Sequence, residues 1–390
     1  MMLFEITPKI FPARAETRIK ISPLYEHVRF TKSVYNVEII GMEAHDGSSV
    51  SVDARNGALS FTIFGAREQE YRIRIEDAAA FSVYCLDDDL FGRIPLKGDF
   101  HIHSNRSDGR EPPAFVAAAS RKIGMDFMAI TDHHRYAPSL EAIDAFRDFK
   151  TDLLIFPGEE VHPPNNPVHI INFGGNRSVN GMFGERYEAE VGKIAETLAV
   201  PDGVDSVIYA GCEWCFEKIR QCGGISLLCH PYWITGDRYN VASAFLDYMM
   251  LRKPFTAFEL LGGHEAESNN IQTAYYGEKR SEGLLVPVVG VSDAHSVMGG
   301  DYFGWTYTIV FVNGRSLEDI KEGVERGFSA AVESLPGENH RAYGKLRFVK
   351  YALFLLREYF PAHDARCAKE AEAMFEHIRT DEKQGGFTNA

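Results

Sequence analysis

The sequence predicts an α/β protein in which a small all-β domain precedes a closed barrel of βα units. Residues 1–95 consist of short runs in which apolar and polar residues alternate, as in half-buried strands. From residue 96 onward, apolar strand-like runs alternate with helix-like segments, the pattern of a parallel sheet with crossover helices. So many units in about 240 residues fit a barrel better than an open doubly wound sheet, which also satisfies the pattern.

The first 95 residues are expected to form a sandwich-like antiparallel domain. TRIKIS, NVEIIGME and EYRIRIED are short alternating runs, and several strands at this spacing are typical of β-sandwiches. Asn56-Gly57 stands between two such runs and predicts a hairpin turn there. This region contains no cluster of ionisable residues that demands chemistry.

The barrel is predicted over residues 96–335, from strands and helices in regular order. The helix over 111–124 has prolines at its start and a glycine at its end, which are helix boundary signals. Residues 336–390 are expected to add a C-terminal helical segment and a tail. The expected strands are 97–104, 125–134, 153–162, 167–175, 224–233, 255–263, 285–296 and 305–313, and the other helices 139–152, 206–222, 241–253, 269–283 and 316–327.

Composition narrows the class of protein. The net charge of −14 argues against broad nucleic-acid binding, which needs a basic surface. No apolar run approaches the roughly 20 residues of a membrane helix. The first residues lack a secretory signal, so we expect a cytoplasmic protein. Cys212 and Cys215 form a CxxC without a second ligand pair nearby, and we interpret them as free thiols on a helix rather than a zinc or redox site.

Ionisable residues gather where the predicted barrel strands end. His101 and His103 are two residues apart in a strand and therefore point to the same face, and Asp293 and His295 repeat that spacing. Nine of the 14 histidines lie in such segments: His101, His103, His133, His134, His162, His169, His230, His264 and His295. The C-terminal ends of barrel strands meet on one face, where active sites form.

The joint pattern predicts a metal centre. On its own, His169 or His230 would be explained as a structural histidine, but unpaired buried groups of this kind would cost several kcal/mol each. Imidazole mixed with carboxylate suits zinc, manganese or iron and matches calcium poorly. The candidate ligands exceed the needs of one ion, so we expect two or three, with a carboxylate such as Glu160 bridging. Clustered ions generate hydroxide at neutral pH and clamp phosphoryl oxygens.

Six motifs, in order, resemble those of the PHP-domain (polymerase and histidinol phosphatase) metal-dependent phosphoesterases: HIHSNRSDG, ITDHH, GEEV, VHIINFGG, LCHP and GVSDAH. The resemblance covers about 96–335 and leaves out the N-terminal β region. It implies a distorted (β/α)7, TIM-like barrel with a three-metal site at the strand ends. The form with a preceding β domain is most similar to stand-alone PHP hydrolases, and the chain has no polymerase domain.

The resemblance also implies a role for each candidate ligand. His101, His103 and Asp293 would hold the first metal, and Glu160 would bridge it to a second. Glu160 is preferred to Glu159 because of the family's GxE pattern. The second metal would be held by His169 and His230, and the third by Asp108, His133 and His295.

The expected function is hydrolysis of phosphate esters or phosphodiesters by metal-bound hydroxide, on a small-molecule phosphoester or short nucleotide. His134 would contact substrate or support a ligand. Tyr232 and Trp233 would form a wall of the site. Candidate phosphate contacts are Arg106, Arg135 and Arg177.

Two alternatives stay open. The chain lacks a clear glycine-rich phosphate cradle, so metal-dependent hydrolysis of a non-phosphate ester or amide is the first. The second is a metal-bearing binding scaffold whose β region recognises a partner. The sequence makes no prediction of oligomeric state.

Overall fold

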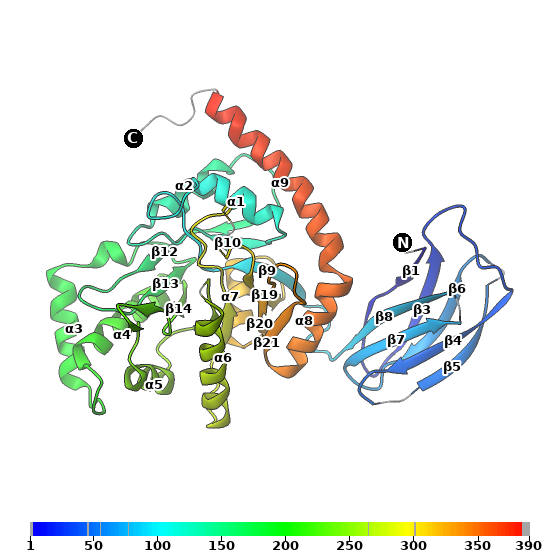
Figure 1. The fold of residues 1–390 in the computed structure, drawn as a ribbon, viewed down its shortest axis with the longest axis horizontal. Helices are drawn as coiled ribbons and strands as arrows, with labels where there is room; N and C mark the ends of the chain where they lie inside the picture. Colours follow the sequence, from blue (N-terminus) through cyan, green and yellow to red (C-terminus); the bar gives the residue numbers. More distant parts are fainter. Residues whose placement is uncertain are drawn as a thin grey trace. The chain divides into compact units, whose positions relative to one another are not determined.

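The computed structural model divides into two compact units, residues 1–93 and 94–390 (Figure 1). It describes residues 3–44, 47–54, 56–76, 78–263, 265–299 and 302–383, with side chains to residue 380. His264, one of the predicted strand-end histidines, lies outside the described residues.

In the first unit, every regular element of the described residues is a strand. Three strands form one sheet in the order β1 (Phe4–Thr7), β3 (Glu16–Pro23), β6 (Leu59–Phe64). Five form another in the order β2 (Ile10–Pro12), β8 (Ala79–Leu86), β7 (Gln69–Ile75), β4 (Val34–Gly41), β5 (Gly47–Asp53). Strands of both sheets bury alternate side chains in one core, which includes Ile19, Val37, Phe61 and Ile73.

The prediction of a hairpin at Asn56-Gly57 is wrong. Gly57 has a φ of +75°, so a turn does form there. Its two flanking strands separate, however: β5 pairs with β4, and β6 pairs with β3 in the other sheet. The dipeptide signals local backbone geometry, but burial of alternate β6 side chains in the core decides which sheet the strand joins.

The strands of the second unit form two curled sheets rather than one closed ring of hydrogen-bonded strands in the described residues. The first has the order β11 (Leu154–Phe156), β10 (Phe127–Ala129), β9 (Ile94–Asp99), β19 (Thr306–Val312), β20 (Ser329–Glu333), β21 (Arg341–Gly344). The second has the order β12 (Gly158–Val161), β13 (Ile170–Phe173), β14 (Ile225–Leu228), β17 (Ala257–Leu261), β18 (Val288–Gly290). Isolated parallel bridges, Ile102 to Ala294 and His133 to Glu160, join strand extensions of the two sheets.

Strand direction departs from the uniformly parallel series that the sequence pattern predicts. β9, β10 and β11 are parallel, as are β14, β17 and β18. In contrast, β13 is antiparallel to both of its neighbours, and β19, β20 and β21 add antiparallel strands. The loop 162–169 is too short for a crossover helix, so β13 returns directly beside β12. The unit is therefore a mixed α/β fold.

Helices cover the two sheets. The first begins at Pro113 and is followed by Gly124 with a φ of +90°, in agreement with the predicted boundary signals. None of the helices in the described part of the chain is long and apolar enough to cross a bilayer. The helices are α1 (Pro113–Lys122), α2 (Ala137–Ala145), α3 (Glu185–Thr197), α4 (Ser206–Gln221), α5 (Ser243–Arg252), α6 (Ala266–Ser281), α7 (Leu317–Glu325), α8 (Leu346–Glu358) and α9 (Phe360–Lys383).

The C-terminal helix α9 lies along α1 (Figure 1). The rings of Phe115 and Phe375 are 4.9 Å apart, and Arg121 donates to Glu370 at 2.7 Å. Glu370 also accepts from the backbone of Asp152, directly before β11. The helix α9 therefore packs near the N-terminal ends of β10 and β11, opposite the end from which His133 emerges.

Candidate metal centre

The histidines that follow β9, β10 and β14 emerge at one edge of the sheets. His101 and His103 follow β9 in extended backbone, so both rings point to the same face, and His133 follows β10. His230 follows β14, and Asp293 and His295 follow β18. Because the parallel strands end on one side, their polar C-terminal extensions converge.

His169 reaches this edge by a different route from the one predicted. It precedes β13 and so stands at the N-terminal end of its strand, not at the C-terminal end. The antiparallel direction of β13 places this start beside the end of β14, where the Cys229 backbone N–H donates to the His169 carbonyl. The sequence pattern identified the residue but assumed the wrong strand direction.

The Glu160 carboxylate lies at the centre of the cluster and is fully buried. Its Oε2 faces ring nitrogens of His101, His103 and His133 at 3.6, 3.5 and 2.6 Å. Its Oε1 faces nitrogens of His162, His169 and His230 at 3.7, 2.8 and 3.6 Å. The structure places Glu160, rather than Glu159, among the imidazoles.

The surroundings of Glu160 favour its anionic form. Burial raises the pKa of this carboxyl, but the charges of His169 and His101 outweigh burial and hold the pKa well below its usual range. Neither oxygen has a hydrogen-bond partner in the described residues, although both are buried. Two oxygens that each face three imidazoles suit a carboxylate that bridges two cations.

The first ligand group consists of His101, His103, Asp293 and Glu160. The Nε2 atoms of His101 and His103 are 3.1 Å apart, and both lie close to Asp293 Oδ1, at 3.1 and 2.9 Å. Ligands about 2.0–2.1 Å from a tetrahedral ion are about 3.3 Å from one another. The observed separations therefore match a shared cation.

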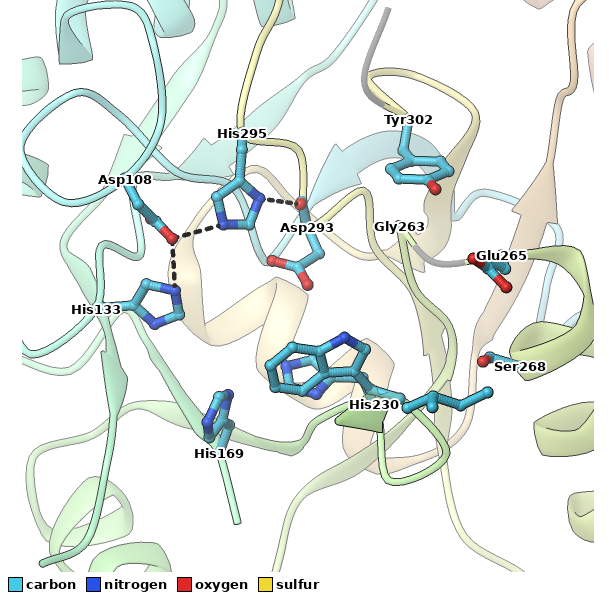
Figure 2. A pocket seen from close by; sticks show the side chains of 12 residues that line it. Asp108, His133, His169, His230, Gly263, Glu265, Ser268, Asp293, His295 and Tyr302 are labelled. Carbon is cyan, nitrogen blue, oxygen red and sulfur yellow. Dashed lines mark hydrogen bonds and ion pairs between the residues drawn. The ribbon is translucent and has the colours of Figure 1, made fainter. Parts of the chain in front are cut away.

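The second and third ligand groups adjoin the first. His169, His230 and Glu160 Oε1 form one of them. In the other, Asp108 Oδ2 is 3.3 Å from Nε2 of both His133 and His295 (Figure 2). Burial lowers the pKa of His133, but its contacts with Asp108 and Glu160 raise it to about 10. All nine predicted ligands thus fall into three adjoining groups.

The donor set fits divalent cations. Imidazole nitrogens face one another and carboxylates across 2.6–3.7 Å, and the buried His103 Nδ1 and His169 Nδ1 have no hydrogen-bond partner among the described residues. Such crowding of buried nitrogen and oxygen atoms is costly unless cations satisfy them. Mixed imidazole and carboxylate ligands suit zinc, manganese or iron.

Three of the described non-glycine residues with a positive φ lie in the same region. His134, His230 and Asp293 have φ angles of +59°, +22° and +46°, in the left-handed region that side chains other than glycine seldom adopt. Strained residues of this kind cluster at functional sites, where the surrounding structure holds them in place.

A pocket of about 550 Å³ opens onto the three ligand groups. In Figure 2, His169, His230, Asp108 and His295 stand on one side, and Tyr302, Glu265 and Ser268 on the other. Trp233 and Ile234 also line it. Tyr232 instead packs with Tyr239 and Tyr275 and is buried.

The arginines predicted to grip phosphate do not line this pocket. Arg106 makes two hydrogen bonds to Glu141, at 2.9 and 2.7 Å. Arg135 and Arg177 are exposed, as is His134, and none of the four belongs to the pocket lining. Among the described lining residues there is no lysine or arginine.

Comparison with known proteins finds solved structures that match parts of the chain at low identity. No protein-family model and no curated protein matches it. A two-domain protein from Bacteroides vulgatus, assigned as containing a PHP-like metal-dependent phosphoesterase, matches 65% of this chain and 77% of its own, at 19% identity and a TM-score of 0.43.

Two other solved structures match about half of the chain. A protein from Bifidobacterium adolescentis assigned as a metal-dependent phosphoesterase covers 51% of this chain and 87% of its own (19% identity, TM-score 0.35). An amidohydrolase from Chromobacterium violaceum, with bound sulfate and no metal, covers 52% and 89% (18% identity, TM-score 0.33). The structure is similar to PHP-like phosphoesterase structures. The phosphoesterase and amidohydrolase activities named here are those of the matched proteins.

Two further groups, the buried Glu259 and the half-buried His162, lie outside the PHP-like motif assignments. Glu259, in β17, has its Oε2 3.1 Å from His101 Nδ1, on the far side of that ring from Asp293. His162 was recognised as a strand-end histidine but not assigned as a ligand, and its ring adjoins His133 and His169. A lone acidic residue inside the apolar run FTAFELLGG was the available signal for Glu259.

Proposed function

We propose that this protein is a metal-dependent hydrolase of phosphate esters or phosphodiesters. The observation that carries the proposal is the convergence of eight imidazole and carboxylate side chains around Glu160, the ninth candidate ligand, at the floor of a pocket. Two or three zinc, manganese or iron ions would be held by the three ligand groups described above. Bound divalent cations supply water activation and neutralise charge on a phosphoryl group.

The residues of the chain would position substrate around this centre. Trp233 and Tyr302 offer aromatic surfaces to a leaving group, and Glu265 offers a hydrogen-bond acceptor. His134 and Arg135 directly follow His133 and are exposed, which makes them candidates for contacting substrate outside the pocket. We propose a small phosphoester or short nucleotide as the substrate.

A second candidate function is hydrolysis of a non-phosphate ester or amide. It is favoured by the absence of lysine and arginine from the described pocket lining. Phosphate sites commonly supply such cations, because they pair with the phosphate oxygens. If the substrate is a phosphoester, the metal ions must pair with its phosphate oxygens inside this pocket.

An assay of the metal-reloaded protein separates these functions. The full chain would be stripped with a chelator, reloaded with manganese, zinc or ferrous iron, and tested on p-nitrophenyl phosphate, bis-p-nitrophenyl phosphate and nucleotides. Matched assays would use p-nitrophenyl acetate and p-nitroanilides. We expect metal-dependent turnover of phosphoesters. Turnover of the acetate or anilides alone would favour the second function, and a full metal complement without any turnover would favour a binding scaffold.

Two broader proposals accompany this function. We propose that residues 96–335 correspond to a distorted (β/α)7 barrel, supported by the bridges that connect the two sheets at the candidate site.

We also propose a cytoplasmic location, and the six buried free thiols fit a reducing compartment.

A further inference from the structure

Two ligand histidines in this cluster, His101 and His295, have their second ring nitrogen next to an acceptor. His101 has Nε2 toward Asp293 and Nδ1 3.1 Å from Glu259. His295 has Nε2 toward Asp108 and Nδ1 2.9 Å from the backbone oxygen of Asp293. An acceptor at the second nitrogen holds the proton there, which fixes the tautomer and aims the other nitrogen at a cation.

His133 follows the same arrangement with an unusual acceptor. Its Nε2 faces Asp108 at 3.3 Å, and its Nδ1 lies 2.8 Å from Nε2 of His162 in hydrogen-bonding geometry. Glu160 Oε2 is also close to that Nδ1, at 2.6 Å, but outside hydrogen-bonding geometry. With the proton on His133 Nδ1, the lone pair of His162 Nε2 is its acceptor.

We propose that His162 is a positioning residue that fixes the tautomer and orientation of His133 toward Asp108 and His295. The proposal rests on the metal centre proposed above. It assigns His162 the role that Glu259 has for His101 and that a backbone carbonyl has for His295.

The surroundings of His162 hold its ring in place. Its side chain is 17% exposed, and its ring centroid is 4.0 Å from that of His169. Its backbone N–H donates to Asn180 Oδ1 at 3.2 Å, and Asn180 in turn donates to the Glu160 carbonyl at 2.9 Å. The acceptor is thus anchored to the same strand that carries the central carboxylate.

Metal binding to paired variants of the full chain tests this role. His162→Met keeps the size of the side chain but removes the acceptor, whereas His162→Gln retains an amide oxygen that accepts a hydrogen bond. Each protein would be stripped, titrated with zinc, and analysed for ions per chain and for zinc dissociation constants. The control is His340→Gln, at an exposed histidine.

We expect His162→Met to bind one zinc ion fewer than wild type, or to bind its weakest ion about 10–100-fold more weakly. We expect His162→Gln to lie within about threefold of wild type, because an acceptor is retained. Rescue by glutamine is a result that a purely structural role would not produce. Unchanged stoichiometry and dissociation constants in His162→Met would overturn the proposal.

A combined variant distinguishes positioning from direct coordination. His162, His133 and Glu160 also offer atoms close enough to share an ion. If His162 acts through His133, adding His162→Met to His295→Ala removes no further ion, because the ion at Asp108 is already lost. Loss of one more ion would show direct coordination and contradict the positioning role.

The zinc readout is independent of substrate. A wild-type chain that binds zinc but hydrolyses no phosphoester would refute the proposed function and leave this inference standing. A wild-type chain that binds no zinc would overturn both.

Discussion

Asp293 is the carboxylate that holds the first ligand group together. Its Oδ1 lies 2.9 Å from His103 and 3.1 Å from His101, and its backbone has a φ of +46°. The residue therefore combines ligand geometry with strain that the fold maintains.

Replacing Asp293 by asparagine should reduce turnover by at least about 100-fold. Loss of a group that only supports a ligand typically costs 10–100-fold, and Asp293 is itself a candidate ligand. Asparagine keeps the shape, so the fold should persist while the number of bound ions falls. The measurement is kcat together with ions per chain, with His340→Gln as control. Turnover equal to wild type would remove Asp293 from the site.

Residue types and spacing were sufficient to predict which side chains gather around Glu160, but not the groups that contact them from other elements. His101 and His103, two residues apart in a strand, could be assigned to one face from periodicity. Glu259 and His162 act on ligands that come from other elements, and only the fold brings them together. The arginines predicted to contact phosphate do not line the pocket, because sequence proximity to a motif does not determine the direction of an exposed side chain, and their contact with substrate stays a prediction.

At the scale of elements, α9 is held to the rest of its unit by buried ionic contacts. Arg121 is 4% exposed and donates to Glu370, to the Met125 carbonyl and to Asp126. These contacts lie at the N-terminal ends of the strands, away from the pocket. Their loss should therefore lower stability without affecting substrate binding.

Replacing Arg121 by methionine should lower the free energy of unfolding by about 3 kcal/mol, because two carboxylates lose their buried partner. Lys122→Met is the matched control: it makes the same charge change one residue further along α1 at an exposed position, and should cost no more than about 0.5 kcal/mol. Urea unfolding gives both values. Equal costs would show that the buried contacts contribute nothing, and a changed KM in Arg121→Met would contradict the separation of α9 from the pocket.

The contact of His363 with Asp126 should make the stability contributed by α9 depend on pH. Burial lowers the pKa of His363, but hydrogen bonds to Asp126 and Asp364 outweigh it and raise the pKa to about 11. The unfolded value is about 6.5. Because the pKa of His363 is higher in the folded than in the unfolded state, its protonation contributes fully to folding stability below about pH 6.5. This contribution declines as pH rises toward about 11.

His363→Gln should therefore destabilise the protein by about 1–3 kcal/mol at pH 6 and by progressively less toward pH 10. Urea unfolding of variant and wild type at pH 6, 8 and 10 gives the difference, and comparison at each pH cancels the titration of other groups. A difference that does not vary with pH would contradict the proposed protonation of His363.

Element directions were harder to predict than element positions. The run PVHIINFGG was correctly expected to contain a strand. Its antiparallel direction follows from the short loop after β12, whereas the alternation of strand-like and helix-like segments predicts a parallel strand. Similarly, Asn56-Gly57 correctly marks a turn, yet core burial in a second sheet decides the pairing of β6. A short local connection thus sets the direction of β13, whereas non-local packing decides the pairing of β6.

At the scale of the whole molecule, all candidate ligands belong to one of the two compact units. Residues 94–390 contain the nine ligands, and residues 1–93 contain none of them. The three tryptophans, Trp214, Trp233 and Trp305, also lie within 94–390. Tryptophan fluorescence therefore reports unfolding of the ligand-bearing unit alone, whereas far-UV circular dichroism reports both units.

Metal binding should stabilise the two units unequally. An ion that binds only the folded state at 100 times its dissociation constant adds about 2.7 kcal/mol, so saturating zinc or manganese should raise the fluorescence-detected midpoint by about 5 °C or more. The part of the circular dichroism change that fluorescence does not detect reports the first unit, and its midpoint temperature should stay the same. The Asp293→Asn protein under the same conditions is the control, and its fluorescence midpoint should shift less. The cations proposed here contact only the second unit. An equal shift of both transitions, or a shift that Asp293→Asn fully retains, would therefore mean that the ions bind outside the proposed ligand groups.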